Sequence, residues 1–203
     1  MFIMKVFKKY FFCILLSLSY YTNAHEINVI PANNIDGHIL QRLKALFIES
    51  FSNAYKQIDI KDINSNFDST SNYLDHLFDI DWKSVNNLNF DLIVTTENQE
   101  IIGYVLCCYC YENKKIYIHH LVVDMNKHRK GIGKILVNAC ENFYKDAHYI
   151  SLSTRKFNLN AIGFYKYIGF YETDSVPEIT YLIRPNAKNN PQIINLEKSL
   201  TKK

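Results

Sequence analysis

The segment from Ile116 to Tyr144 constrains the fold most strongly. It consists of an apolar run (Ile116–Val123), a loop that contains His128-Arg129-Lys130-Gly131-Ile132-Gly133, and a stretch with apolar residues at helical spacing (Lys134–Tyr144). Glycines let a backbone turn sharply and approach a ligand closely, and the amide N–H groups at a helix start bind anions. The segment therefore predicts a strand, a phosphate-binding turn and a helix in sequence.

The rest of the chain predicts a mixed α/β fold built around this unit. Short apolar or alternating runs between polar turns predict strands at Glu26–Pro31, Phe90–Thr96, Ile101–Tyr111, Ile116–Val123, Tyr149–Thr154, Tyr171–Thr173 and Ile179–Ile183. Helical spacing predicts helices at Ile35–Ala54, around Tyr73–Phe78, at Lys134–Tyr144 and at Asn160–Ile168. The three strands between Phe90 and Val123 are joined by short turns, so we expect an antiparallel meander there.

Residues 1–24 have the layout of a secretory signal peptide. A basic start (Lys5, Lys8 and Lys9) precedes an uncharged run from Tyr10 to Ala24, and the small residue Ala24 precedes His25. The run is shorter than the about 20 apolar residues that span a membrane comfortably, so an uncleaved anchor is the alternative. We expect export, a folded domain over residues 26–184 and a mobile tail over residues 185–203.

Charge and cysteine usage exclude several classes of function. The three leader lysines account for the whole formal charge of +3, so we expect no nucleic-acid partner for the neutral domain, and a membrane contact only through an uncleaved leader. The spacing of Cys107, Cys108 and Cys110 fits neither a disulfide framework nor a zinc site, and we expect buried thiols and no metal. Because free thiols are unusual in exported proteins, delivery into a reducing cytosol is an alternative to secretion.

The glycine turn by itself is weak evidence for a nucleotide site. A dinucleotide-binding turn would have a third glycine where this chain has Leu136, and a P-loop would have Gly-Lys-Ser/Thr after a longer loop. A nucleotide-binding protein is therefore the weakest of the functions considered.

Two blocks together resemble the GNAT superfamily of acyl-CoA N-acyltransferases. His119–Gly133 is similar to the family's strand and Arg/Gln-x-x-Gly-x-Gly/Ala loop, although His128 replaces the usual first Arg or Gln. Asn158–Phe170 is similar to its Asn…Ala…Tyr-x-x-x-Gly-Phe signature. The resemblance implies a mostly antiparallel central sheet with flanking helices, in which one parallel strand pair splays apart to form a cleft.

The resemblance also implies a binding site for acetyl-CoA as co-substrate. The turn would hold the pyrophosphate, the backbone of a bulged strand would meet the pantetheine arm, and an Asn would lie near the cofactor. These expected cofactor-binding residues are Leu121, Val122, Val123, His128, Arg129, Lys130, Gly131, Ile132, Gly133, Lys134 and Asn158. Asn160 is the residue that we expect to cap the following helix.

For the chemistry, the resemblance implies Tyr165 as the general acid that protonates the leaving thiolate. The strand lacks the Glu that many relatives use as base, and His119 is the candidate, with His120 as the alternative. An imidazole titrates near neutrality, as a base requires. Simple strand alternation would place Tyr117, His119 and Leu121 on one face of the sheet, and Ile118, His120 and Val122 on the other.

The sequence thus predicts an N-acetyltransferase that transfers acetyl from acetyl-CoA to a primary amine by direct attack in a ternary complex. A catalytically degenerate acyl-CoA sensor is the alternative. The acidic and aromatic stretch Ser50–Asp81 falls where the family has its acceptor loops, and its carboxylates would either attract a cationic amine or form a solvated surface. The acceptor itself, whether a small molecule or a protein amine, is left open.

Overall fold

The computed structural model describes residues 25–32, 35–87, 89–175 and 192–200. The expected signal peptide and the expected strand at Ile179–Ile183 lie outside these residues. Within them, no helix combines the length and the apolar character that crossing a membrane requires.

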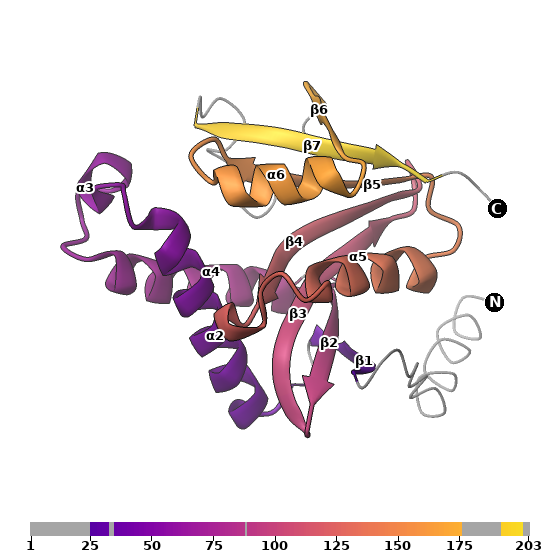
Figure 1. Ribbon diagram of the computed structural model, residues 1–203, viewed down its shortest axis with the longest axis horizontal. Coiled ribbons are helices and arrows are strands. Elements are labelled where there is room, and N and C mark those ends of the chain that lie inside the picture. Colours follow the sequence, from indigo (N-terminus) through magenta and orange to yellow (C-terminus); the bar gives the residue numbers. More distant parts are fainter. Residues whose placement is uncertain (1–24, 33–34, 88, 176–191, 201–203) are drawn as a thin grey trace.

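A seven-stranded sheet with the order β1-β2-β3-β4-β5-β7-β6 forms the centre of the molecule (Figure 1). Neighbouring strands are antiparallel except for β4 and β5, which are parallel. The sequence therefore predicted the mixed sheet and its parallel pair correctly. The strands are β1 Glu26–Pro31, β2 Asp91–Glu97, β3 Glu100–Cys110, β4 Lys115–Val123, β5 Tyr149–Arg155, β6 Tyr171–Thr173 and β7 Ile193–Ser199.

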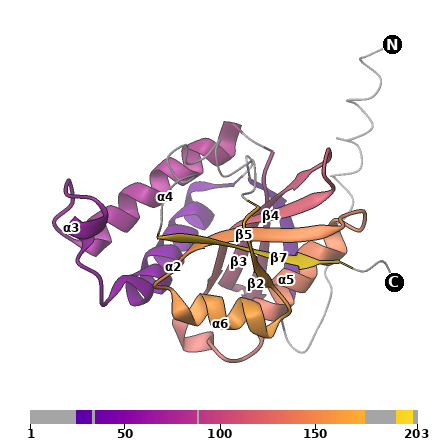
Figure 2. The same cartoon turned by 90° about the horizontal axis from the view of Figure 1, so that it is seen from above.

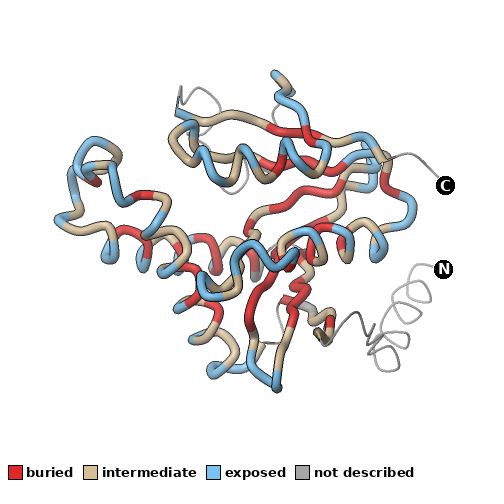
Figure 3. The backbone as a smooth tube through the Cα atoms, viewed as in Figure 1, coloured by how far each residue is buried: buried red, intermediate tan, exposed pale blue. Residues whose placement is uncertain are grey.

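Helices cover both faces of the sheet (Figure 2). One apolar core holds residues of α2 (Gly37–Tyr55), α3 (Ile60–Ile63) and α4 (Thr70–Asn87), and the other holds residues of α5 (Ile132–Phe143) and α6 (Leu159–Tyr167). A short 3₁₀ helix, Met125–Lys127, links β4 to the loop before α5. Because the middle of the sheet is covered on both sides, β3 is buried continuously from Ile102 to Cys108 (Figure 3).

The parallel pair β4–β5 is short. Its register runs only from Lys115↔Tyr149 to Ile118↔Leu152, and beyond this point β5 continues to pair with β7. The second half of β4, His119–Val123, keeps β3 on its other edge. The two parallel strands therefore diverge, as the family resemblance implied, and the edge of β4 that faces β5 becomes open to a ligand.

β7 corrects the expectation of a mobile tail. Ile193–Ser199 pairs with β5 along its whole length and with β6 over Tyr171–Thr173, and Leu196 is fully buried. The segment before β7 is rich in Asn and contains two prolines, a composition that predicted the end of the domain at residue 184. The expected tail is wrong for Ile193–Ser199, since these residues belong to the sheet.

A β-bulge in β4 corrects the expected alternation of its side chains. Leu106 pairs with His120 and Cys107 with Ile118, so His119 is the extra residue between them. The bulge lets His119 and His120 lie on the same side, with ring centroids 4.5 Å apart. His120 also packs on Phe47 of α2, which defines that side as the one covered by α2 and α4. The bulge implied by the resemblance is confirmed, whereas the opposite facing of His119 and His120 is wrong.

Candidate active site

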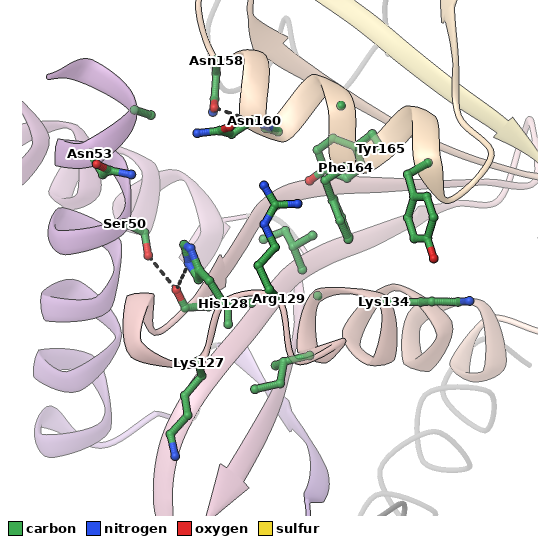
Figure 4. Close-up of a pocket in the computed structure, with 18 of the residues that line it drawn as sticks. Ser50, Asn53, Lys127, His128, Arg129, Lys134, Asn158, Asn160, Phe164 and Tyr165 are labelled. Carbon is green, nitrogen blue, oxygen red and sulfur yellow. Dashed lines mark hydrogen bonds between the residues drawn. The ribbon is translucent and has the colours of Figure 1, made fainter. Parts of the chain in front are cut away.

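A groove of about 680 Å³ opens where β4, the loop before α5, α2 and α6 meet (Figure 4). Its volume lies within the range of sites that hold small molecules and cofactors. We call it the main groove, and the described residues that line it are Ser50, Phe51, Asn53, Ala54, Leu121, Val123, Lys127, His128, Arg129, Gly131, Ile132, Gly133, Lys134, Asn158, Leu159, Asn160, Ala161, Gly163, Phe164, Tyr165 and Tyr167.

The start of α5 forms one wall of the main groove. The helix begins at Ile132, two residues earlier than predicted, and Gly131 at its N-cap has φ +82° and makes no side-chain cap. Arg129 also has a positive φ, +62°. The first N–H groups of a helix have no partner inside it, and they carry the positive end of the helix dipole. The uncapped start of α5 is therefore suited to an anionic group such as a diphosphate.

The cations around this turn differ in their availability. Arg129 lines the groove and extends toward α6, as Figure 4 shows, and Lys134 lines it from the first turn of α5. Lys127 also lines the groove but makes an ion pair with Glu97, which holds the pKa of that carboxyl below its usual value. Lys130 is exposed and is not among the lining residues. Arg129 and Lys134 are thus the better-placed charges.

The second glycine of the turn has a packing role. A Cβ on Gly133 would lie 3.1 Å from the ring of Phe164 on α6. A Cβ on Gly131, by contrast, would meet no atom of the described residues within 4 Å. Gly131 is therefore required by its backbone conformation, and Gly133 by the close contact between α5 and α6.

The open edge of β4 forms the floor of the main groove. Leu121 and Val123 line it, while the Val122 side chain is buried among the residues packed under α2 and α4. The Val123 carbonyl accepts hydrogen bonds from Ser50 Oγ at 2.9 Å and from His128 Nε2 at 3.0 Å. His128 thus contacts the strand rather than pointing at the anion site, and the Val123 carbonyl is a weaker candidate for a cofactor contact than Leu121.

Asn158 begins α6 and also lines the main groove. Its side chain accepts a hydrogen bond from the Ala161 N–H at 3.3 Å, so Asn158 is the N-cap of the helix. Asn160, which we expected to cap it, is an exposed lining residue in the first turn. The assignment of the cap to Asn160 is wrong, because the helix begins one residue earlier than predicted.

Tyr165 lies on α6 between the main groove and a smaller recess of about 110 Å³ beside it, and it lines both. Its exposed fraction is 6%, and burial raises the pKa of its hydroxyl well above the ordinary value. The phenol therefore stays protonated at neutral pH and is available as a proton donor. Figure 4 shows its hydroxyl directed toward the space between α6 and the loop before α5.

The smaller recess contains both candidate bases. His119 and His120 line it together with aromatic residues of α2 and β4, among them Phe51, Tyr55 and Tyr117. His120 is held at both ring nitrogens, by Asp81 Oδ2 at 3.1 Å and by the Tyr104 hydroxyl at 3.5 Å. His119 Nε2 lies 3.6 Å from the same carboxylate oxygen. The structure thus brings His119 and Tyr165 to the same recess.

The acidic stretch does not contribute carboxylates to either cavity. Asp75 and Asp79 pair with Lys44, and Asp81 is fully buried beside the two histidines. None of the described residues that line the groove or the recess is acidic. The expectation that these carboxylates attract a cationic amine at the site is therefore not supported, and the stretch contributes aromatic and apolar side chains instead.

Sequence reasoning placed the stretch Ser50–Asp81 near the acceptor site, but it did not single out Asp81 or the α2 residues Ser50, Asn53 and Ala54 within it. Nothing in the local sequence signals them, because α2 and α4 reach the site only through their packing on the sheet. The polar residues Ser50 and Asn53 of α2 face the groove, but their spacing in the sequence is the same as that of polar residues facing solvent on any amphipathic helix.

Comparisons with known proteins agree with this fold. A family model described as the acetyltransferase (GNAT) family matches residues 47–170. Among solved structures, the PaiA N-acetyltransferase from Thermoplasma acidophilum in complex with coenzyme A has a TM-score of 0.60 at 18% identity, covering 86% of this chain and 99% of that one. A GNAT-family acetyltransferase from Staphylococcus aureus has a TM-score of 0.56 at 19% identity, covering 86% and 99%. No similar sequence was found among the curated proteins.

Proposed function

Because the chain belongs to the acetyltransferase (GNAT) family, we propose that it transfers an acetyl group from acetyl-CoA to a primary amine by direct attack within a ternary complex. The observation that carries the proposal is that the uncapped start of α5 and the buried hydroxyl of Tyr165 belong to one groove. The first suits a diphosphate and the second suits a leaving thiolate.

In the proposed complex the CoA diphosphate lies on the N–H groups at the start of α5, with Arg129 and Lys134 beside it. The pantetheine arm follows the open edge of β4 near Leu121 toward Tyr165. This placement is supported by the divergence of β4 and β5, which leaves that edge of β4 beyond Ile118 without a neighbouring strand from the part of the chain that the structure describes. The thioester then lies close to the recess that holds His119.

In the proposed reaction the amine nitrogen attacks the thioester carbonyl carbon, and the carbon–sulfur bond breaks as the tetrahedral intermediate collapses. His119 accepts the proton that the amine loses, and Tyr165 donates a proton to the departing thiolate. His119 is preferred over His120 because both ring nitrogens of His120 already have partners in the protein, Asp81 and Tyr104. The described residues that line the recess are largely aromatic or apolar and include no carboxylate, which favours an amine with a small apolar or aromatic body.

The test is turnover and binding measured on the same protein. Free-thiol release from acetyl-CoA is followed with a panel of amines, and acetyl-CoA binding is measured by calorimetry. We expect turnover, and we expect Tyr165→Phe to lower kcat by about 10²- to 10⁴-fold with little change in acetyl-CoA affinity, since only the acid is removed. Tyr111→Phe, at an exposed tyrosine that lines neither the main groove nor the recess, is the matched control.

The same measurements address the alternative, an acyl-CoA sensor. Tight binding of acetyl-CoA without turnover on any amine would favour the sensor. A Tyr165→Phe variant as active as the wild type would remove the phenol from the mechanism, and tighter binding of NAD or ATP than of CoA would contradict both proposals.

We also propose that the chain is exported and that residues 1–24 are removed. The support is the basic start, the uncharged run and the small residue before His25. Cell fractionation followed by N-terminal sequencing of the native protein tests it. A mature protein that begins near His25 is expected, and an intact Met1 in the cytosol would contradict the proposal.

A further inference from the structure

Three side chains that can bind a metal ion converge beneath the bulge of β4. Asp81 comes from α4, and His119 and His120 come from β4. One donor atom of each lies within 4.8 Å of the others. The side chains are almost fully buried, with exposed fractions of 0%, 3% and 2%.

The bulge creates this cluster. Successive residues of a regular strand point to opposite faces, so two adjacent histidines would be separated by the sheet. Here the two rings are nearly parallel, with 18° between their planes. Both Nε2 atoms therefore approach the same oxygen of Asp81, at 3.1 Å from His120 and at 3.6 Å from His119.

The hydrogen bonds within the cluster are incomplete. His119 Nε2 is buried and has no hydrogen-bond partner among the described residues. Most buried polar side-chain atoms have a partner, so such an atom requires an explanation. An imidazole nitrogen that is buried beside a carboxylate and a second imidazole is the arrangement of an incomplete coordination sphere.

We propose that Asp81, His119 and His120 bind one divalent transition-metal ion, with Zn²⁺ as the best fit. Two imidazole nitrogens and one carboxylate oxygen are the donor types that zinc prefers, and three protein ligands leave a fourth position for water or substrate. The Tyr104 hydroxyl lies 3.5 Å from the other ring nitrogen of His120, in the place where zinc-bound histidines have a supporting oxygen. His119 and His120 line the recess, which gives the ion a route of entry.

Metal binding would also change the activity, a consequence that rests on the proposed function. His119 cannot accept a proton while its imidazole is bound to zinc, so Zn²⁺ acts as an inhibitor. Removal of the ion by a chelator restores the base.

The test uses the purified full chain, stripped with EDTA, exchanged into buffer without chelator and titrated with Zn²⁺ by calorimetry. We expect one Zn²⁺ ion per chain. We expect Asp81→Asn and His119→Gln each to weaken Zn²⁺ binding by at least about tenfold, because mutating even a residue that only supports a metal ligand lowers the affinity by that factor. His76→Gln is the control, because His76 is exposed on α4 and lies outside both cavities. Circular dichroism and thermal unfolding verify that each variant is folded. No binding to the wild type, or equal binding by the variants, would overturn the proposal.

Cobalt distinguishes this site from a cysteine site and does not depend on the variants. We expect Co²⁺ to give the visible bands of a four- or five-coordinate site with nitrogen and oxygen ligands. A thiolate charge-transfer band would instead assign the ion to cysteines such as Cys107 and Cys140, whose sulfurs are 3.6 Å apart, and would contradict the proposal. Binding is measured without turnover, so a protein that binds zinc but transfers no acetyl group would refute the proposed function and leave this inference intact.

Discussion

The two halves of β4 differ in their neighbours and in what their residues do. The first half, Lys115–Ile118, pairs with β3 on one edge and with β5 on the other, and Ile116 and Ile118 are buried in the core. The second half, His119–Val123, begins with a bulge, contains both histidines and faces the cavities with its free edge. One strand can therefore stabilise the sheet where it is paired and carry reactive side chains where the pairing stops.

The largest effect is expected from the open half. His119→Gln removes the proposed base, so we expect kcat to fall by about 10²- to 10⁴-fold while the melting temperature stays near that of the wild type. Steady-state kinetics and thermal unfolding measure the two quantities. Ile116→Val, a conservative change in the closed half, serves as control and should leave kcat unchanged. If His119→Gln keeps full activity while His120→Gln loses it, the base is His120.

Shortening a side chain in the closed half should have the opposite result, a loss of stability without a loss of kcat. Ile116 has an exposed fraction of 0%, and Ile116→Ala leaves a cavity in the core between the sheet and α5. We expect the free energy of unfolding to fall by about 2–5 kcal/mol, measured by urea denaturation. The kcat of the folded fraction should not change. Full stability together with a lost kcat would mean that the closed half also takes part in the chemistry.

The turn that follows the open half is expected to show a moderate effect on both properties. Gly131→Ala has space for its methyl group, but φ +82° strains a residue with a side chain, by about 1–2 kcal/mol. We expect lower stability and weaker binding of acetyl-CoA, measured by unfolding and by calorimetry. Gly37→Ala at the start of α2 is the matched control, since it also has open space around the new methyl but lacks the positive φ. Unchanged acetyl-CoA affinity in Gly131→Ala would argue against a role of this turn in diphosphate binding.

The smallest effect concerns the ion pair at the end of the open half. Asp124 accepts a hydrogen bond from Arg42 of α2 at 3.2 Å. Although burial alone would raise the pKa of Asp124, the backbone N–H of Asn126 and the Arg42 guanidinium hold it below its usual value of 3.8. A lowered pKa in the folded state gives stability that is present above the unfolded-state value and is lost as the pH falls through the folded one.

We therefore expect Asp124→Asn to lower the free energy of unfolding by about 1 kcal/mol at pH 7, the typical contribution of a partly exposed hydrogen bond to a charged group. The difference in stability between wild type and variant should shrink below about pH 4. Urea denaturation of both proteins between pH 3 and pH 7 measures it. A difference that grows as the pH falls would have the wrong sign for this ion pair.

The sequence predicted the elements around the two motifs because their signals are local. The glycine turn, the helix after it and the Asn158–Phe170 block each lie within one continuous segment, and the structure has them within one or two residues of the expected bounds. The bulge at His119 came from the family resemblance, since no periodicity reveals an extra residue in a strand.

Features that depend on distant residues could not be predicted in this way. Asp81 lies 39 residues before His120, and only the packing of α4 against the sheet brings them together. β7 was missed because Ile193–Ser199 lacks a clear alternation and follows a segment with the composition of a linker. The capping role of Asn158 and the packing role of Gly133 both follow from the position of α6, whose start was predicted one residue too late.

The place of β7 in the sheet affects how the protein can fold during synthesis. β7 lies between β5 and β6, so β6 and the edge of β5 that faces away from β4 pair with a strand only after Ile193–Ser199 has been made. Most of the domain has been synthesised before β7. A nascent chain that pauses earlier therefore carries an unfinished sheet with an exposed strand edge. Cutting the gene before this segment would consequently yield an aggregation-prone fragment, and not a shortened enzyme.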